Sequence, residues 1–327
     1  MMEINKENQH QFMLFNLEDC IPANHLLRSI EKVVDFSFIY KKVQHLYSPI
    51  GRKSIDPVIL IKMLLLGYLY GIPSERKLKE QVQLNLAFRW YLGLGLEESI
   101  PDHSTLSQNR RRRFKESTIF QEIFDHIVST CVSSGLVTGE GIVTDSTHIK
   151  AHASDYQSEK VWKEQTLSDY LKELEQEVHR LEKKLQDKRE VQGKKKCGPS
   201  KQSPPDKSER KEVKRSTTDP DSGWLNRPQK PVGYHYLGHT SIDTKHGIIT
   251  DIHVTPGNVN DNDPYVERLS LQKTKFGLSI QKVGADKGYD SSLIHHGLKK
   301  LDIQGYIAPQ QHSSIDSIDG KNLFMIL

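Results

Sequence analysis

The N-terminal part of the chain alternates apolar and polar positions with the period of an α-helix. Apolar residues recur three and four positions apart over Leu26–Val34 and again over Ile119–Val132, which places them on one face of a helix. Between these stretches Asp56 precedes Pro57, the order expected for a helix N-cap and first turn. The residues that follow are apolar on nearly every side. The pattern predicts an all-helical domain over residues 1–135.

After Gly141 the apolar positions form the short, β-branched runs that are typical of strands. The run Ile142-Val143-Thr144 leads directly into Asp145, and further runs of this kind continue to Ile307 with helical patterns between the last of them. Such an order of strands, hairpin and helices is typical of one mixed sheet flanked by helices. The sequence therefore predicts a second, α+β domain over residues 136–327.

A strongly charged stretch, residues 156–231, interrupts this second domain. Its first half has leucine and valine at alternating spacings of four and three, the pattern of a coiled-coil seam. The seam positions are Leu167, Leu171, Leu174, Val178, Leu181 and Leu185. From Lys194 to Ser222 apolar residues are almost absent, which is typical of a disordered segment. We expect a helix and then a disordered basic linker.

Composition excludes several classes of protein. Cys20, Cys131 and Cys197 form no Cys-x-x-Cys pair, so neither a disulfide framework nor a zinc module is indicated. The most apolar run, Ile59–Ile72, contains Lys62 and is shorter than the roughly 20 residues that a membrane span needs. The formal charge of +4 is small for 327 residues, so any nucleic-acid affinity must come from local clusters. We expect a soluble, cytoplasmic protein.

One basic cluster stands out, a run of four arginines: Arg110, Arg111, Arg112 and Arg113. Successive residues of a helix are rotated by about 100°, so these side chains cannot share one face, and some must point to solvent or to a polyanion. Arginine suits bidentate contacts with phosphate and guanine. We expect a DNA-binding helix at this run. A solvated basic face beside an acidic patch is the alternative.

Two aspartates that end strand-like runs are the candidates for chemistry. Asp145 follows the run described above, and Asp286 ends a later run that begins near Ser279. If their strands were neighbours, the two carboxylates would meet, and hard carboxylate oxygens are the ligands that Mg²⁺ prefers at phosphoryl-transfer sites. The alternative for Asp145 is a turn after the strand, which aspartate also favours.

Together these stretches resemble the DDE transposases of bacterial insertion sequences. The resemblance covers nearly the whole chain, in the order of the family. The matching stretches are Asp56–Phe114, Thr144–Ala151, Ser216–Gly223, Gly233–Tyr236 with His239–Asp243, and Gly284–Ser291. The resemblance implies an RNase H-like core with Asp145 on its first strand and Asp286 at the end of its fourth. It also implies that the helical domain binds the terminal inverted repeats of the element.

The same resemblance implies that Asp145 and Asp286 hold Mg²⁺ or Mn²⁺ for cleavage of the element end and for attack of the freed 3′-hydroxyl on target DNA. Double-stranded DNA would be the partner, bound by a homodimer in a synaptic complex at the nucleoid. Lys150, just after the first strand, and Trp224, which could stack on an extruded base, are further candidates for DNA contact. A solvated lysine and a loop anchor are the alternatives.

The sequence departs from the family pattern near its C-terminus. The family has a third acid, a Glu on a helix after the fifth strand, and no Glu follows Glu267 in this chain. We therefore expect a truncated and catalytically impaired copy. The alternative is a non-catalytic DNA-binding protein that occupies transposon ends or interferes with the intact enzyme. An unrelated RNase H-like nuclease would leave the basic helical domain unexplained.

Overall fold

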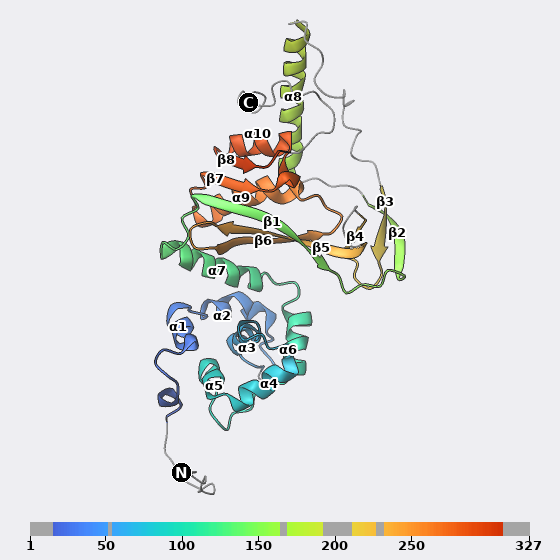
Figure 1. The fold of residues 1–327 in the computed structure, drawn as a ribbon. Coiled ribbons are helices and arrows are strands. Elements are labelled where there is room, and N and C mark those ends of the chain that lie inside the picture. The colour runs from blue at the N-terminus through green and yellow to red at the C-terminus, as the bar shows by residue number, and fades with distance from the viewer. Residues whose placement is uncertain (1–15, 52–53, 164–168, 192–210, 227–231, 310–327) are drawn as a thin grey trace, which may run out of the picture. The chain divides into compact units, whose positions relative to one another are not determined.

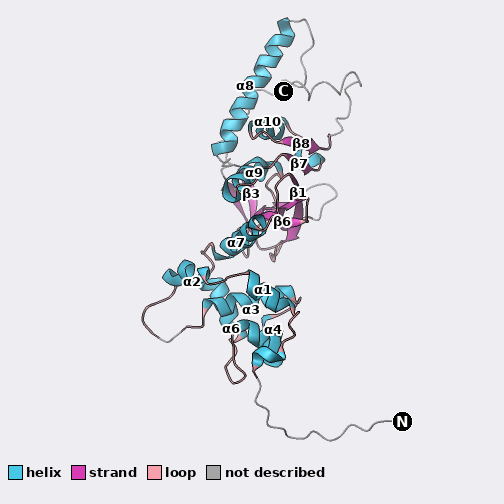
Figure 2. Cartoon of the chain, turned by 90° about the vertical axis from the view of Figure 1, so that its left-hand side faces the viewer, coloured by secondary structure: helices cyan, strands magenta, loops and turns pink. Residues whose placement is uncertain are grey.

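The fold is described from a computed structural model of the chain, over residues 16–51, 54–163, 169–191, 211–226 and 232–309. The chain divides into two compact units, Met1–Ile127 and Val128–Leu327. Among the described residues, strands occur only in the second unit (Figure 2). This division falls within a helix that spans Ile119–Ser133. The predicted limits of the two functional domains stay a prediction.

The first unit is built from short helices around one apolar core. Its elements are η1 (Leu17–Cys20), α1 (Leu26–Val33), α2 (Phe38–Val43), η2 (Gln44–Leu46), α3 (Pro57–Leu69), α4 (Glu75–Leu84), α5 (Leu86–Leu92), α6 (His103–Gln108), η3 (Asn109–Arg113) and the start of α7 (Ile119–Ser133). Helix α3 begins as predicted, because Asp56 Oδ1 accepts a hydrogen bond from the Val58 amide at 2.7 Å. Its Met63 and Leu66 are fully buried, so this helix, apolar on nearly every side, lies in the core of the unit.

Lys62 interrupts the apolar sequence of α3 without leaving an uncompensated charge in the core. Its side chain is 10% exposed, and Nζ lies 2.6 Å from Glu31 Oε2. The same ammonium donates to the Tyr91 carbonyl oxygen at 3.2 Å. A buried charge is tolerated when it is paired and hydrogen-bonded in this way.

The second unit is built on a mixed sheet. Its strands are β1 (Gly141–Lys150), β4 (Gly223–Leu225), β5 (Gly233–Asp243), β6 (Ile248–Pro256), β7 (Lys282–Ala285) and β8 (Gln304–Ile307). Strand β1 lies between β5, which is antiparallel to it, and β7, which is parallel. Beyond them, β6 pairs with β5 in an antiparallel manner and β8 with β7 in a parallel one. This order confirms the predicted mixed α+β core with β1 at its centre (Figure 1).

Helices α9 (Asn262–Phe276) and α10 (Ser292–Lys300) pack on one face of the sheet. On this face Ile142 and Val283 are buried against Val266, Leu269 and other helix residues. The opposite face is exposed over the described residues. Exposed apolar side chains on it include Val143 at 45%, Ile149 at 49%, Ile252 at 40%, Val254 at 53% and Tyr306 at 56%. A large ligand therefore has access to this open face.

The insertion has more regular structure than its composition predicts. The expected helix is present as α8 (Asp169–Val191), which leads away from the sheet beyond α10 (Figure 1). The linker prediction was wrong for Lys211–Ser216, because this segment is strand β3 and pairs with β2 (Ser158–Lys163) in an antiparallel ribbon. Backbone pairing with a distant segment overrides the polar composition of β3. The predicted disorder at 194–210 lies outside the described residues.

Near its N-terminal end, α8 packs on the sheet unit through residues of the predicted coiled-coil seam. Leu171 and Leu174 are buried, and Glu177 lies 3.1 Å from both His296 Nε2 and Lys300 Nζ of α10. No described helix is long and apolar enough to cross a bilayer.

This anchoring predicts that Leu174→Ala lowers the free energy of unfolding of the sheet unit by roughly 2–5 kcal/mol, because Leu174 is fully buried and its truncation leaves a cavity. Urea unfolding followed by circular dichroism measures the change. Val191→Ala, at a position that is 89% exposed, is the control and should leave the midpoint unchanged. Equal midpoints for both variants would show that α8 does not stabilise the unit.

Candidate active site

The pairing of β1 with β7 brings the two candidate aspartates together. In this parallel pair Val143 lies opposite Gly284. Asp145 lies two residues after Val143, and Asp286 lies two residues after Gly284. If the same register continues past the end of β7, the two aspartates lie side by side. Neighbouring strands are about 4.8 Å apart, and matched positions point to the same face of a sheet. Both residues are exposed, so a negatively charged pair lies on the open face.

Each carboxylate is held by one nearby backbone amide. Asp145 Oδ1 accepts from the Ser146 amide at 2.7 Å. Asp286 caps the short helix η4 (Lys287–Tyr289) and accepts from the Gly288 amide at 2.9 Å. Within the described part of the chain neither carboxylate forms an ion pair with a basic side chain. Their charge is therefore available to a cation from solution.

Tyr289 lies beneath this pair. The sequence placed it in the turn after Asp286, where a phosphate contact was the less favoured interpretation, and it was not among the predicted site residues. It is 1% exposed, and its ring packs on Tyr265 with the ring centroids 4.8 Å apart. Burial raises the pKa of the Tyr289 phenol well above its usual range. The charges of Asp145 and Asp286 act in the same direction, so the phenol stays neutral beside the carboxylates.

A further carboxylate, Asp261, also acts on Tyr289, and its charge is the largest contribution after burial to the raised pKa of that phenol. Asp261 precedes α9, but its side chain makes no capping hydrogen bond. Its Oδ1 is buried with no hydrogen-bond partner among the described residues. The signal available in the sequence, an Asp before a helix, indicated a cap and not this position.

The two aspartates provide some of the ligands that a divalent metal ion needs. Asp145 and Asp286 offer hard oxygen ligands at neighbouring positions and carry no neutralising partner in the described chain, which suits a divalent cation. No group of three or more His, Cys, Asp or Glu side chains within the described residues is arranged to hold a metal ion. Two aspartates therefore fit part of a coordination shell, with room for water and substrate oxygens.

The four arginines do not share one environment. Arg110 is paired with Glu75 at 3.0 Å. Arg113 donates to Asn109 at 2.6 Å and to Ser54 at 2.9 Å. The α-helix expected here was wrong in its final turn, because Phe114 donates to the carbonyl five residues earlier and Asn109–Arg113 is a π-helical turn. Such turns are frequent at functional sites.

Arg111 and Arg112 are exposed, and neither side chain pairs with another residue of the described chain. Arg112 also lines a shallow cavity of about 440 Å³ together with Leu46 and Gln108. The structure therefore separates two arginines that hold the unit together from two that are available to a ligand.

Lys150 and Trp224 lie apart from the carboxylates. Lys150 ends β1 and is exposed, but it is an odd number of residues from Asp145 and so belongs to the other face of the strand. Trp224 is in β4, where its ring packs edge-on to Tyr234 and has the Lys214 ammonium 3.5 Å from its centroid. One face of the indole is thus already covered. DNA contact at either residue stays a prediction.

The sequence comparisons agree with the class of site that the sheet and the aspartates define. Residues 138–323 match the family model described as a Transposase DDE domain, and residues 15–112 match the one described as a Transposase domain, DUF772. The first of these matches covers more than half of the chain. The protein belongs to the DDE transposase family.

Two solved structures of Mos1 transposase are similar to the chain, each at 11% sequence identity. The Mos1 mariner paired-end complex with Mn has a TM-score of 0.22, with 85% of this chain and 65% of that chain covered. The paired-end complex with the left transposon end has a TM-score of 0.23, with 88% and 69% covered. The chain thus spans about 65% of the length of the first of them. No curated protein matches the chain.

Two histidines behind the aspartates give the unit a predicted pH dependence. His239 and His253 face each other across β5 and β6 with ring centroids 6.1 Å apart, and burial lowers the pKa of both. In the unfolded chain histidine takes up a proton near pH 6.5, while the folded chain resists protonation until a lower pH. The unfolded state then binds more protons, so stability is fully present above about pH 6.5 and is lost as the pH falls below it.

The urea midpoint of the sheet unit should therefore drop between about pH 8 and about pH 5.5. In His253→Gln the drop should be smaller, because one of the two groups no longer titrates. The matched control is His246→Gln in the exposed turn before β6, which should keep the full drop. A drop of the same size in His253→Gln and in the control would contradict the assignment.

Proposed function

We propose that this protein is a DNA transposase that cleaves a DNA strand at the end of a mobile element and joins it to target DNA. Asp145 and Asp286 are the catalytic carboxylates, and they hold Mg²⁺ or Mn²⁺. The observation that supports this most is the β1–β7 register, which sets two unneutralised carboxylates next to each other on the accessible face of the sheet. Family membership supports the class of reaction.

The proposed chemistry is two displacements at phosphorus. In the first, water attacks a phosphodiester and the bond to the 3′-oxygen breaks, which leaves a 3′-hydroxyl and a 5′-phosphate. In the second, this 3′-hydroxyl attacks a phosphodiester of target DNA and is joined to it as the bond to the original 3′-oxygen breaks. A bound divalent ion supplies charge stabilisation for the attacking and leaving oxygens. Asp145 and Asp286 would hold such an ion, and the neutral Tyr289 lies below them without adding charge.

The helical unit is proposed to bind the DNA end through its exposed arginines. Arg111 and Arg112 are candidates for phosphate or base contacts, since Arg110 and Arg113 are engaged with Glu75 and Asn109. Double-stranded DNA with the terminal inverted repeats of the element is the proposed partner, bound by two copies of the chain. Paired-end complexes of this kind are described for Mos1 transposase.

The test of catalysis is strand cleavage. With Mg²⁺ or Mn²⁺ and a labelled duplex taken from the DNA that flanks the coding sequence, the protein should nick one strand, and slow nicking would agree with the impaired copy that the sequence predicts. Asp145→Asn and Asp286→Asn should each lower the rate at least about 100-fold, because in-line displacement tolerates little misplacement of the reacting groups. The readout is the labelled product on a denaturing gel.

The matched control is Asp302→Asn. Asp302 is an exposed aspartate with φ of 57°, a conformation that Asn also adopts easily, so this change removes a carboxylate without strain. It should cleave like the wild type. If the wild-type chain binds the duplex and never cleaves it, the catalytic proposal fails and the alternative of a non-catalytic DNA-binding protein takes its place.

DNA binding has a separate test in the arginine run. The double variant Arg111→Ala/Arg112→Ala should weaken duplex binding and lower the magnitude of the salt slope by up to about 1.8, since each lost phosphate contact removes roughly 0.9. Fluorescence anisotropy at several salt concentrations measures both. Lys32→Ala/Lys41→Ala removes the same charge from exposed positions of α1 and α2. If both double variants lost the same amount of DNA affinity, the loss would be explained by net charge alone. That result would contradict a specific role for the arginine run.

A further inference from the structure

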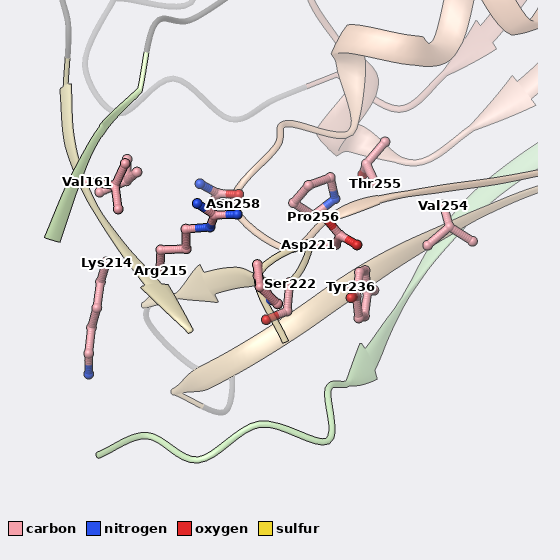
Figure 3. Close-up of a pocket in the computed structure, with 12 residues that line it drawn as sticks. Val161, Lys214, Arg215, Asp221, Ser222, Tyr236, Val254, Thr255, Pro256 and Asn258 are labelled. Atoms are coloured by element: carbon pink, nitrogen blue, oxygen red, sulfur yellow. The ribbon is translucent and has the colours of Figure 1, made fainter. Parts of the chain in front are cut away.

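A cavity of about 500 Å³ lies where the β2–β3 ribbon faces the ends of β5 and β6 (Figure 3). Valine and proline side chains and Tyr236 form its apolar wall, and Arg215, Asp221, Ser222 and Asn258 are among its polar groups. Ligand sites of about 300–1,000 Å³ typically combine an apolar lining with a few polar groups in this way. Neither Asp145 nor Asp286 lines the cavity, so it is separate from the carboxylate pair.

Arg215 is the cationic side chain that is free to bind a ligand here. It is exposed on β3 and has no hydrogen bond or ion pair with any residue that the structure describes. Its neighbour Lys214 is engaged elsewhere, with Nζ 3.5 Å from the Trp224 ring centroid and 3.1 Å from the Asp155 carbonyl oxygen. Figure 3 shows Lys214 pointing away and Arg215 reaching toward Asn258. A guanidinium presents a planar fork of donors that matches phosphate.

The cavity wall is held in place by two close backbone approaches. A Cβ on Gly223 would lie 2.6 Å from the Asn258 amide nitrogen, and a Cβ on Gly257 would lie 2.7 Å from the His235 carbonyl oxygen. The Gly257 amide donates to that same carbonyl at 2.8 Å. Only glycine permits such contacts, so the loop that carries Asn258 is fixed against β4 and β5.

The opposite wall of the cavity is formed by Tyr236 and Val254. The Tyr236 hydroxyl donates to Asp219 Oδ1 at 2.7 Å, which fixes the ring. Val254 beside it is 53% exposed. A flat ring and an exposed valine form a surface on which a planar, weakly polar group can pack. Aromatic side chains serve as stacking platforms for bases in this manner.

The cavity and the carboxylates share one face of the sheet. Thr240 of β5 is paired with Asp145, and Tyr236 is on the same strand and the same face. These positions are four residues apart, which corresponds to about 14 Å along a strand. One DNA strand laid along this face would therefore reach both places.

We propose that this cavity binds one unpaired nucleotide of a DNA strand, with Arg215 on its phosphate and the base against Tyr236 and Val254. The inference rests on the proposed function, because it assigns a second contact to the strand that is cleaved at the carboxylates. A base reaches a cavity of this kind only when it is unstacked and unpaired. The site therefore prefers single-stranded DNA over a duplex of the same length.

The test is binding of a labelled single-stranded oligonucleotide to the full chain in EDTA, measured by fluorescence anisotropy. Arg215→Ala should weaken binding about tenfold or more, as for loss of a charged hydrogen bond, and should lower the magnitude of the salt slope by about 0.7. Val254→Trp fills the cavity and keeps the charge, so it should weaken binding and leave the salt slope unchanged. Blunt duplex binding should respond less to both variants.

Two matched controls separate the cavity from its surroundings. Lys160→Ala removes a charge from the same ribbon at a side chain paired with Glu212 at 3.1 Å, and Ile249→Trp adds a large ring near the other end of β6 at a position 40% exposed. Both should bind like the wild type, and thermal midpoints check the fold of all variants. Equal losses in Arg215→Ala and Lys160→Ala, or wild-type binding by Val254→Trp, would overturn the inference.

Because binding is measured without a divalent ion, its outcome is independent of strand cleavage. Metal-dependent cleavage by the wild type together with wild-type binding by Arg215→Ala and Val254→Trp would overturn the nucleotide site alone. Loss of single-strand binding in these variants, with a wild type that never cleaves DNA, would overturn the proposed catalysis and leave the nucleotide site standing.

Discussion

The hydrogen-bond register of β1 is the constraint on which the rest of the sheet unit depends. One edge of this strand is paired with β5 and the other with β7, so its register decides which side chains face the helices. A slip by one residue would move Asp145 to the buried face and Ile142 to the exposed one. Burial of Ile142 against α9 and α10 opposes that slip. The same apolar contacts that stabilise the unit therefore keep the aspartate on the accessible side.

Strand β1 has an antiparallel neighbour on one edge and a parallel neighbour on the other, and each edge contributes a different part of the candidate site. The antiparallel side, with β5 and β6, forms a continuous surface from Asp145 to the cavity at Tyr236. The parallel side, with β7, brings in Asp286 from a segment 141 residues later in the sequence. Parallel strands need a long connection, and in this chain that connection holds α9, which packs beneath the same strands. The adjacency of the two candidate aspartates and the position of α9 beneath them thus both follow from the parallel pairing of β1 with β7.

The sequence predicted the parts of the fold that depend on local pattern. Helix α3 with its Asp56 cap and the strand over Ile142–Thr144 follow from capping and periodicity, which are local. The strand does not end at Asp145 as the sequence suggested, because pairing with β5 continues it to Lys150. The β2–β3 ribbon was not predicted, because Lys211–Ser216 has the composition of a linker and forms a strand only through pairing with Ser158–Lys163. Propensity is overridden when a distant partner supplies the ladder.

The same limit applies to the candidate site. Asp145 and Asp286 were identified from their motifs, but their adjacency depends on a register that no local pattern contains. Tyr289 and Asp261 were missed because their roles depend on what lies next to them after folding. The arginine run shows the same limit for identical residues. Arg110 pairs with Glu75 and Arg113 with Asn109, and the sequence alone does not show which of the four arginines have such partners.

The attachment of α8 has a mechanical consequence. Its contacts with α10 through Leu174 and Glu177 fall within the first nine of its 23 residues. The remaining 14 residues, Val178–Val191, extend about 21 Å beyond them at 1.5 Å per residue. The helix is therefore attached near its N-terminal end and extends beyond that attachment. A tilt of about 10° at the attached end would displace the far end by roughly 4 Å over that length. Small changes in the packing of α10 are amplified at the tip of the insertion.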